Sequence, residues 1–357
     1  MTTTRSFVAA TGCYIPDNII PNSDFLQRQF YEKDGSAIQR DSAVIIEKFR
    51  EISGIAERRY ASPDQTASDM GFIAATKAFT SSGINPETMD YIIVAHNFGD
   101  VKFQTNRSDT VPTLASRIKA KLGIKNPDCV AYDLPFGCPG WVQGMIQADY
   151  FIRSGDAKRC LVIGAETLSR VMDFSDRDSM LYSDGAGATI LMATTEKNKG
   201  ILAHKTQTYA ADHACLLQME HSYNHENPQA DIFLKMNGRK LYEFALSTVP
   251  QVIKLALDKA GVHLSEIKKV LIHQANDKMD AAIVDRVFKL YGMEYNDPSI
   301  MPMTISWLGN SSVATVPTLL DLILKGKIEN QSLNKGDKVI IASVGAGMNI
   351  NAIVYQF

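Results

Sequence analysis

The chain has 357 residues, of which 45% are hydrophobic and 21% charged, a composition typical of soluble globular proteins and sufficient for two domains of ordinary size. Its formal net charge is -2, so no overall basic field argues for nucleic acid or a membrane as a partner. The five cysteines are odd in number and widely spaced, which argues against a disulfide framework or a structural zinc site.

No targeting segment or membrane span is evident from the sequence. The residues that follow Met1 are polar, and no stretch reaches about 18 uninterrupted apolar residues. We therefore expect a cytoplasmic protein without a metal site, whose partners are neither nucleic acid nor membrane.

Apolar periodicity and turn residues predict alternating strands and helices along the first half of the chain. Phe7–Gly12 is predicted to be a strand, whereas residues 22–50 are polar with a helical period, which is more typical of surface than of core. The elements predicted next are a short basic strand after Gly54, a helix from Thr66 to Gly83, a strand over Tyr91–His96, a polar loop over Gly99–Asp109, a helix from Val111 to Gly123, and strands over Cys160–Gly164 and Tyr182–Leu191.

Cys138 lies at the junction of a strand, a turn of small residues and a helix that is predicted to end at Gly155. Pro139 suits the first helical position, because its fixed φ is helical and its missing N–H would be unpaired there. The positive end of the helix dipole would lower the pKa of a thiol at this point and make it a nucleophile. The local sequence is equally compatible with a buried, unreactive cysteine.

The second half of the chain repeats the organisation of the first. A helix that ends at Gly83 precedes the strand Tyr91–His96, and a helix that ends at Gly261 precedes the similar strand Lys269–Gln274. Each half also carries a Gly-Ala-Gly triplet before its last strand. A repeated unit of about 150 residues predicts two α/β halves related by a pseudo-twofold axis.

This duplication brings equivalent helix N-termini together, so Asn310, on a glycine turn, is expected to face Cys138. His273 ends a buried strand, where open α/β sheets carry functional residues, and Asn276 follows three residues later. A histidine in such a place more often has a structural role, which we assign to His96 in the first half. Thiolate, imidazole and carboxamide together can attack one thioester and stabilise negative charge on the carbonyl oxygen of another.

These segments resemble the active-site motifs of the β-ketoacyl-acyl-carrier-protein synthase III family, which has the thiolase fold. The resemblance rests on the turn with Cys138 and on residues 273–276 and 309–317, and it extends over essentially the whole chain. It implies a layered α-β-α-β-α core built from two duplicated α/β halves, residues 1–198 with the cysteine and residues 199–357 with the histidine and asparagine.

The resemblance also implies an activity, that of a 3-oxoacyl-acyl-carrier-protein synthase III-like acyltransferase in type II fatty-acid or related biosynthesis. Cys138 would hold a primer acyl group, while His273 and Asn310 would bind the carbonyl of a malonyl-type carrier-protein thioester as it loses CO2. The resulting carbanion would attack the acylated Cys138 in a decarboxylative Claisen condensation. The enzyme would be a homodimer without a cofactor, and its substrates would be thioesters of acyl carrier protein or coenzyme A.

Two residues near the expected acyl group depart from the family pattern. Val344, beside Gly345 in the glycine-rich C-terminal loop, stands where the family usually has phenylalanine. Val111 matches the family's segment that reaches across the dimer to close the partner's acyl pocket, and a valine there would leave that pocket wider than the usual phenylalanine. A longer or bulkier acyl group is therefore expected.

The expected donor-binding segment departs from the family as well. The positions of the family's tryptophan and arginine, which grip the adenine of coenzyme A, are Lys48 and Ile52 here, whereas Arg177 matches another family arginine on that side. Neither replacement offers both stacking and a guanidinium. We therefore expect the primer to arrive on a carrier protein, or as a coenzyme A ester held chiefly by its acyl chain and pantetheine arm.

Lys278 matches an arginine that contacts the carrier protein in the family. With Arg286 and Lys289 it would form a basic patch on the helix after His273, and acidic carrier proteins bind such patches. A solvated helix face explains the same charges.

Other functions remain open on the sequence alone. A secondary-metabolic ketosynthase that joins two β-ketoacyl thioesters, as in dialkylresorcinol formation, would use the same residues. A cysteine hydrolase would use Cys138 and His273 but leave Asn310 without a role. A catalytically silent partner subunit should lack the nucleophile, which is present.

Overall fold

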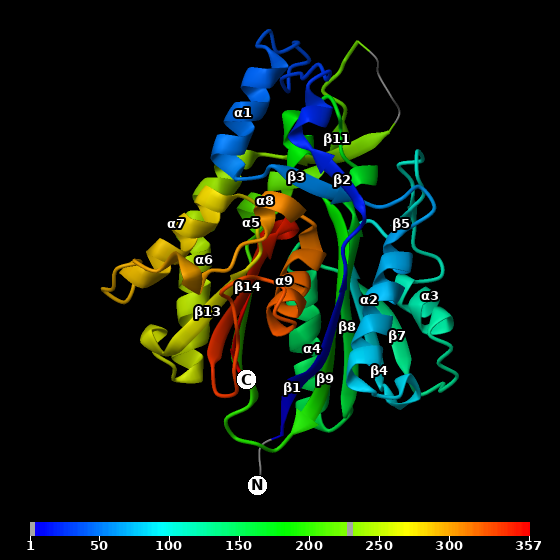
Figure 1. Ribbon diagram of the computed structural model, residues 1–357, viewed down its shortest axis with the longest axis vertical. Helices are drawn as coiled ribbons and strands as arrows, with labels where there is room; N and C mark the ends of the chain where they lie inside the picture. Colours follow the sequence, from blue (N-terminus) through cyan, green and yellow to red (C-terminus); the bar gives the residue numbers. More distant parts are fainter. Residues whose placement is uncertain (1–3, 227–230) are drawn as a thin grey trace.

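Two β-sheets form the body of the protein in the computed structural model, which describes residues 4–226 and 231–357 (Figure 1). The first sheet has the strand order β1-β9-β8-β4-β7, and the second has the order β10-β15-β14-β13. The strands of the first sheet are β1 (Arg5–Tyr14), β4 (Tyr91–His96), β7 (Val130–Pro135), β8 (Arg159–Thr167) and β9 (Asp184–Thr194). Those of the second are β10 (Gly200–Thr208), β13 (Ile267–Ile272), β14 (Lys338–Gly345) and β15 (Asn349–Gln356).

Both sheets use the same pattern of strand pairing. β4 pairs in parallel with β8, as β13 does with β14. The next strands, β9 and β15, are antiparallel to β8 and β14, and the outer strands β1 and β10 are again antiparallel. The internal repeat inferred from the sequence is therefore present in the topology, and the predicted boundary between residues 198 and 199 lies between β9 and β10.

Helices lie between the sheets and on both outer faces, which confirms the predicted α-β-α-β-α layering (Figure 1). The helices α4 (Gly140–Ser154) and α9 (Thr315–Leu324) fill the centre, where Met145 and Leu319 share one core with Val162 of the first sheet and Ile341 of the second. The outer helices are α2 (Ala67–Ser82) and α3 (Leu114–Lys121) on the first sheet, and α6 (Gly238–Ala260) and α7 (Asp277–Lys289) on the second.

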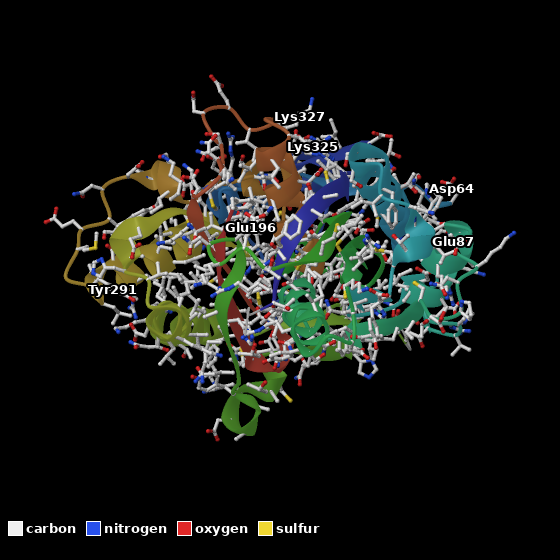
Figure 2. The ribbon with its side chains drawn as sticks, turned by 90° about the horizontal axis from the view of Figure 1, so that it is seen from below. Asp64, Glu87, Glu196, Tyr291, Lys325 and Lys327 are labelled. Carbon is white, nitrogen blue, oxygen red and sulfur yellow. The ribbon has the colours of Figure 1, made fainter. Side chains whose placement is uncertain are left out.

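The view from below shows the two outer layers at opposite sides of the molecule. Tyr291, just beyond α7, and Glu87, in the turn beyond α2, lie far apart at the two flanks (Figure 2). The central helices are apolar nearly all round because both of their faces meet a sheet. In α9, for example, each residue from Thr315 to Ile323 is buried.

Smaller elements cover the upper end of the sheets in Figure 1, above the central helices. These elements are β2 (Asn18–Pro21), α1 (Ser42–Ser53), β3 (Glu57–Tyr60), β5 (Asp100–Val101), β6 (Ser108–Asp109), α5 (Ala210–His213), β11 (Leu217–His221), β12 (Ile232–Met236) and α8 (Ile305–Leu308). Three of them, α1, β11 and β12, line the outer part of the cavity described below.

The ends of two predicted helices differ in the structure. The helix expected from Val111 begins at Leu114, because Thr113 caps it by accepting a backbone hydrogen bond from Ser116. The helix after Cys138 begins at Gly140, and Pro139 is its N-cap rather than its first residue.

The interpretation of residues 22–50 as a polar surface helix was wrong for much of the segment. Only Ser42–Ser53 forms an α-helix, and the apolar side chains of Phe25, Phe30 and Ile45 are buried in a small core of their own. Tertiary packing recruits these scattered apolar residues, although the segment as a whole is polar.

Gly164 in β8 is a point of very close approach between the first sheet and the segment that leads into α9. A Cβ atom at Gly164 would lie 2.3 Å from the carbonyl oxygen of Val313, so the two backbones meet only because no side chain is present. Gly185 in β9 has no such restriction, since the nearest atom to a Cβ there would be 3.5 Å away.

We predict that Gly164→Ala lowers the free energy of unfolding by roughly 1–3 kcal/mol, the usual cost of overpacking a core. Gly185→Ala serves as the matched control and is expected to change it by less than about 0.5 kcal/mol. Equilibrium urea unfolding of both variants and the parent protein measures the difference. Equal stability of the two variants would contradict the proposed close contact.

Candidate active site

A cavity of about 1450 Å³ lies between the two halves and collects most of the residues singled out in the sequence. Its described lining does not include Lys278 or Val111, both of which are exposed on the single chain. The predicted site residues that do line it are Cys138, Arg177, His273, Asn276, Asn310, Val344 and Gly345.

Cys138 is fixed by a backbone-to-backbone contact between the two halves. A Cβ atom at Gly345, at the end of β14, would lie 2.6 Å from the backbone nitrogen of Cys138. A Cβ atom at Gly137 would lie 2.8 Å from the backbone nitrogen of Ala346. The turn that carries the cysteine and the turn after β14 therefore pack against each other without side chains between them.

Burial controls the acidity of Cys138. Loss of solvation raises the pKa of its thiol to about 11, although a hydrogen bond from Ser312 Oγ to Cys138 Sγ, 3.3 Å long, lowers it. The negative charge of Glu166 nearby also raises this pKa. The expected lowering of the pKa by the helix dipole is therefore outweighed by the loss of solvation, although the side chain is only half-buried and lines the cavity. The resting side chain is a thiol at neutral pH.

His273 follows β13 directly, and its backbone N–H donates to the carbonyl oxygen of Ala342 in β14 over 2.9 Å. The side chain is 3% exposed, and burial lowers the pKa of the imidazole to about 4. The ring is therefore neutral at physiological pH and carries one N–H donor. Its Nδ1 atom has no hydrogen-bond partner among the described residues.

Asn310 is held in place by backbone hydrogen bonds to the first half. Its N–H donates to the carbonyl oxygen of Leu181, and its own carbonyl oxygen accepts from the N–H of Ser183. The side-chain oxygen Oδ1 accepts the backbone N–H of Ser312 over 2.8 Å. Because Oδ1 is occupied in this way, the Nδ2 group is the one available to donate into the cavity.

Asn276 and His96 have structural contacts. Asn276 lines the cavity, and its side chain also caps α7 by accepting the backbone N–H of Met279 over 3.1 Å. His96 interacts with Asp133 over 2.9 Å and accepts the backbone N–H of Gly99. His96 thus has the structural role assigned to it from the sequence.

Three residues that the sequence analysis did not single out lie behind Cys138. Asn97 Nδ2 donates to Ser312 Oγ over 3.0 Å and to Glu166 Oε2 over 2.6 Å, and Ser312 in turn donates to the sulfur. Asn97 follows β4 and Glu166 lies near the end of β8, so both stand at the carboxyl ends of neighbouring parallel strands. That position is the signal by which they could have been found.

The outer part of the cavity is formed by α1, β11, β12 and the start of α6. Its walls are largely apolar, with a few charged side chains among them. Lys48 and Ile52 of α1 line it, and so does Arg177, which forms an ion pair with Glu32 over 3.2 Å. The apolar side chains of this outer wall include Ile45, Phe49, Leu217, Met219, Leu234, Met236 and Leu241.

Within residues 4–226 and 231–357, no cluster of three or more histidine, cysteine, aspartate or glutamate side chains is suited to hold a metal ion. The helices in these same ranges include none with the length and apolar character that crossing a bilayer requires.

We predict that alkylation of Cys138 by iodoacetamide is slow at neutral pH and accelerates with each increase of pH up to at least pH 10, because only the thiolate reacts. Mass spectrometry of the peptide that contains Cys138 separates this reaction from alkylation of the exposed Cys215. A rate that reaches its plateau below pH 8 would show that the thiol is acidic and that burial does not control it.

Comparison with known proteins identifies the family of the chain. A family model described as 3-Oxoacyl-[acyl-carrier-protein (ACP)] synthase III matches residues 132–210, and the model of its C-terminal part matches residues 257–357. The Beta-ketoacyl-[acyl-carrier-protein] synthase III 1 of Vibrio vulnificus (strain YJ016) is 34% identical over 355 residues, which are 99% of this chain and 99% of the relative.

Two solved structures of this kind are also similar over their full length. The 3-oxoacyl-[acyl-carrier-protein] synthase III of Aquifex aeolicus VF5 is 28% identical, with a TM-score of 0.78 over 99% of this chain and 100% of the other. The corresponding protein of Thermus thermophilus is 27% identical, with a TM-score of 0.79 over 98% of each chain. The chain therefore belongs to the β-ketoacyl-acyl-carrier-protein synthase III family of condensing acyltransferases.

Proposed function

We propose that the protein joins an acyl group held on Cys138 to a malonyl-type thioester carried by acyl carrier protein. The observation that supports this most strongly is the convergence of Cys138, His273 and Asn310 on one cavity between the two halves. A nucleophile and two neutral hydrogen-bond donors are what a condensation of two thioesters needs.

The chemistry has two stages. In the first, the sulfur of Cys138 attacks the donor thioester, and the donor's thiol leaves with the proton. In the second, His273 and Asn310 donate hydrogen bonds to the carbonyl oxygen of the extender, where negative charge grows as CO2 departs. The electron pair of the broken bond stays on the α-carbon, which attacks the acyl carbon on Cys138, and the C–S bond to Cys138 breaks as the cysteine leaves as a thiolate. This sequence consumes no redox equivalent, so we propose that the enzyme uses no cofactor.

A cysteine hydrolase is a weaker explanation of the same residues. Hydrolysis would need only an activated water beside the acyl group, and the Nδ2 group of Asn310, which is free to donate into the cavity because Oδ1 is occupied, would have no role in it. Membership of a family of condensing enzymes also argues against it.

The size of the cavity supports a long or bulky acyl group. The whole cavity, from Cys138 to the outer channel, has a volume of about 1450 Å³, above the roughly 300–1000 Å³ of most small-molecule sites, so it has room for an acyl chain in addition to a pantetheine arm. Val344 lines it and is smaller than the phenylalanine usual in the family. The apolar wall formed by α1, β11 and β12 is suited to an acyl chain and a pantetheine arm.

The donor is proposed to arrive on a carrier protein or as a coenzyme A ester held by these same apolar contacts. Lys48 and Ile52 of α1 line the cavity at the positions that bind adenine in the family. Neither supplies the aromatic face together with the guanidinium that grips a nucleotide base.

The carrier protein is proposed to dock beside the cavity at Lys278, in the first turn of α7. Lys278, Lys48 and Arg40 are exposed, and none of them has an ion-pair partner among the described residues. Arg286 instead donates to the carbonyl oxygen of Leu246 and Lys289 pairs with Asp285 over 2.6 Å. Of the three basic residues expected to form a patch on this helix, Lys278 is therefore the one without a partner among the described residues, and docking is proposed at the start of α7 rather than along the whole of α7.

A homodimer is proposed because of Val111. Its side chain is 84% exposed on the single chain, the largest fraction among the large hydrophobic residues described, and a contact with the partner's acyl pocket would cover it. The cytoplasmic location stays a prediction from the sequence.

We predict that Cys138→Ala abolishes both stages, whereas His273→Ala and Asn310→Ala mainly suppress the second. Each lost donor should lower the condensation rate on the order of 100-fold, because it serves the charge that develops on the extender. Intact-protein mass spectrometry follows the acylation of Cys138, and product formation follows the condensation. If His273→Ala and Asn310→Ala lowered the rates of acylation and condensation equally, the two residues would instead act on the Cys138 nucleophile.

Charge reversal tests the docking surface. Lys278→Glu is expected to raise KM for the carrier-bound extender roughly threefold or more at low salt, and the effect should shrink at high salt. Lys289→Glu, on the same helix but paired with Asp285, is the matched control and should have little effect. An equal KM for both variants would exclude docking at Lys278.

A further inference from the structure

We propose that Ser312 is a further catalytic residue, whose hydroxyl donates to the sulfur of Cys138 each time that sulfur carries negative charge. Asn97 and Glu166 act as positioning residues that keep this hydroxyl turned toward the sulfur. The inference concerns the same site and rests on the proposed function, which it deepens by assigning the groups that stabilise the thiolate.

The hydrogen bonds determine which way the Ser312 hydroxyl points. Asn97 Nδ2 lies 3.0 Å from Ser312 Oγ and 2.6 Å from Glu166 Oε2, so its two hydrogens serve these two oxygens. An amide nitrogen accepts no hydrogen bond, so Ser312 Oγ must be the acceptor of the first contact. The proton of the hydroxyl is therefore left for Cys138 Sγ, 3.3 Å away.

Glu166 fixes the orientation of the Asn97 carboxamide. The carboxylate is fully buried, and its Oε2 atom also accepts the backbone N–H of Asn97 over 2.8 Å. With the amide turned over, its carbonyl oxygen would face this oxygen, which already accepts the backbone N–H of Asn97. Burial raises the pKa of Glu166 to about 7, so above that pH the acid is ionised and the two acceptors repel each other. The buried acid thus selects the arrangement in which Asn97 donates to Ser312.

Ser312 is also held in place by its contact with Asn310. Its φ is 53°, a left-handed conformation that is costly for a residue other than glycine, and its backbone N–H donates to Asn310 Oδ1 over 2.8 Å. The same residue thus turns the Nδ2 group of Asn310 toward the cavity and offers its hydroxyl to Cys138. Such strain at an active site is expected when the surroundings impose it for function.

The sulfur carries negative charge twice in the proposed cycle. In acylation, the Cys138 thiol gives up its proton, the S–C bond to the acyl group forms, and the donor's C–S bond breaks as its thiol leaves with a proton. In condensation, the new C–C bond forms while the S–C bond at Cys138 breaks, and the cysteine departs as a thiolate that then regains a proton. A hydrogen bond from Ser312 stabilises the thiolate in both stages, whereas His273 and Asn310 act on the extender in the second stage only.

The test measures alkylation of Cys138 by iodoacetamide against pH in four variants, with the peptide followed by mass spectrometry. Ser312→Ala is expected to slow alkylation at pH 8 about tenfold, because a hydrogen bond to a charged group is lost. Asn97→Ala should slow it in the same direction, and the double variant should be no slower than Ser312→Ala alone, since Asn97 acts through Ser312. Ser311→Ala is the matched control, as Ser311 contacts Thr315 rather than the sulfur, and it should react like the parent protein.

Each outcome bears on a distinct part of the inference. A rate for Ser312→Ala equal to that of Ser311→Ala at every pH would overturn the role of Ser312. Two outcomes would overturn the positioning role of Asn97. In the first, Ser312→Ala is alkylated slowly while a folded Asn97→Ala is alkylated at the parental rate. In the second, the effects of the two substitutions on the alkylation rate add in the double variant. The alkylation assay uses no thioester, so its outcome does not depend on the proposed condensation. A failure of the proposed function would be detected in a separate assay, in which thioesters never acylate Cys138 of the parent protein.

Discussion

The active site depends on one steric constraint, the contact between two turns that leaves no room for side chains. Gly345 meets the backbone nitrogen of Cys138, and Gly137 meets that of Ala346, each at a distance that a Cβ atom could not occupy. This contact joins the ends of β7 and β14, which belong to different halves of the duplicated fold. His273 is bound to β14 by its backbone N–H, so the cysteine and the histidine are positioned by a single strand end.

The closeness of this packing also sets the chemistry. A site withdrawn from water makes His273 neutral and Cys138 a thiol, since desolvation disfavours both charged forms. A neutral imidazole is a suitable donor to a developing oxyanion, whereas a neutral thiol is a poor nucleophile. The enzyme therefore needs a group that stabilises the thiolate only when it forms, and the Ser312 hydroxyl is in contact with the sulfur.

Much of this architecture could be predicted from sequence, because local patterns determine it. The strand Tyr91–His96 was predicted to the residue, and the repeated strand and glycine spacing revealed the duplication. The pKa of Cys138 was predicted in the wrong direction, since its desolvation arises only when the second half covers it. The places of Asn97 and Glu166 at neighbouring strand ends could have been inferred, but their contacts could not, because the hydrogen bonds of Asn97 to Ser312 and Glu166 join positions 215 and 69 residues apart.

The central claim is that Cys138 holds the primer while His273 and Asn310 act on the extender. A single-turnover chase tests it most directly: Cys138 is acylated with a radiolabelled primer, the acyl-enzyme is isolated, and malonyl-carrier protein is added. We predict that label in the parent protein moves within seconds to minutes into a condensed product, while His273→Ala and Asn310→Ala retain it on Cys138. Release of the label as free acid, or transfer at the parental rate in both variants, would rule out these roles.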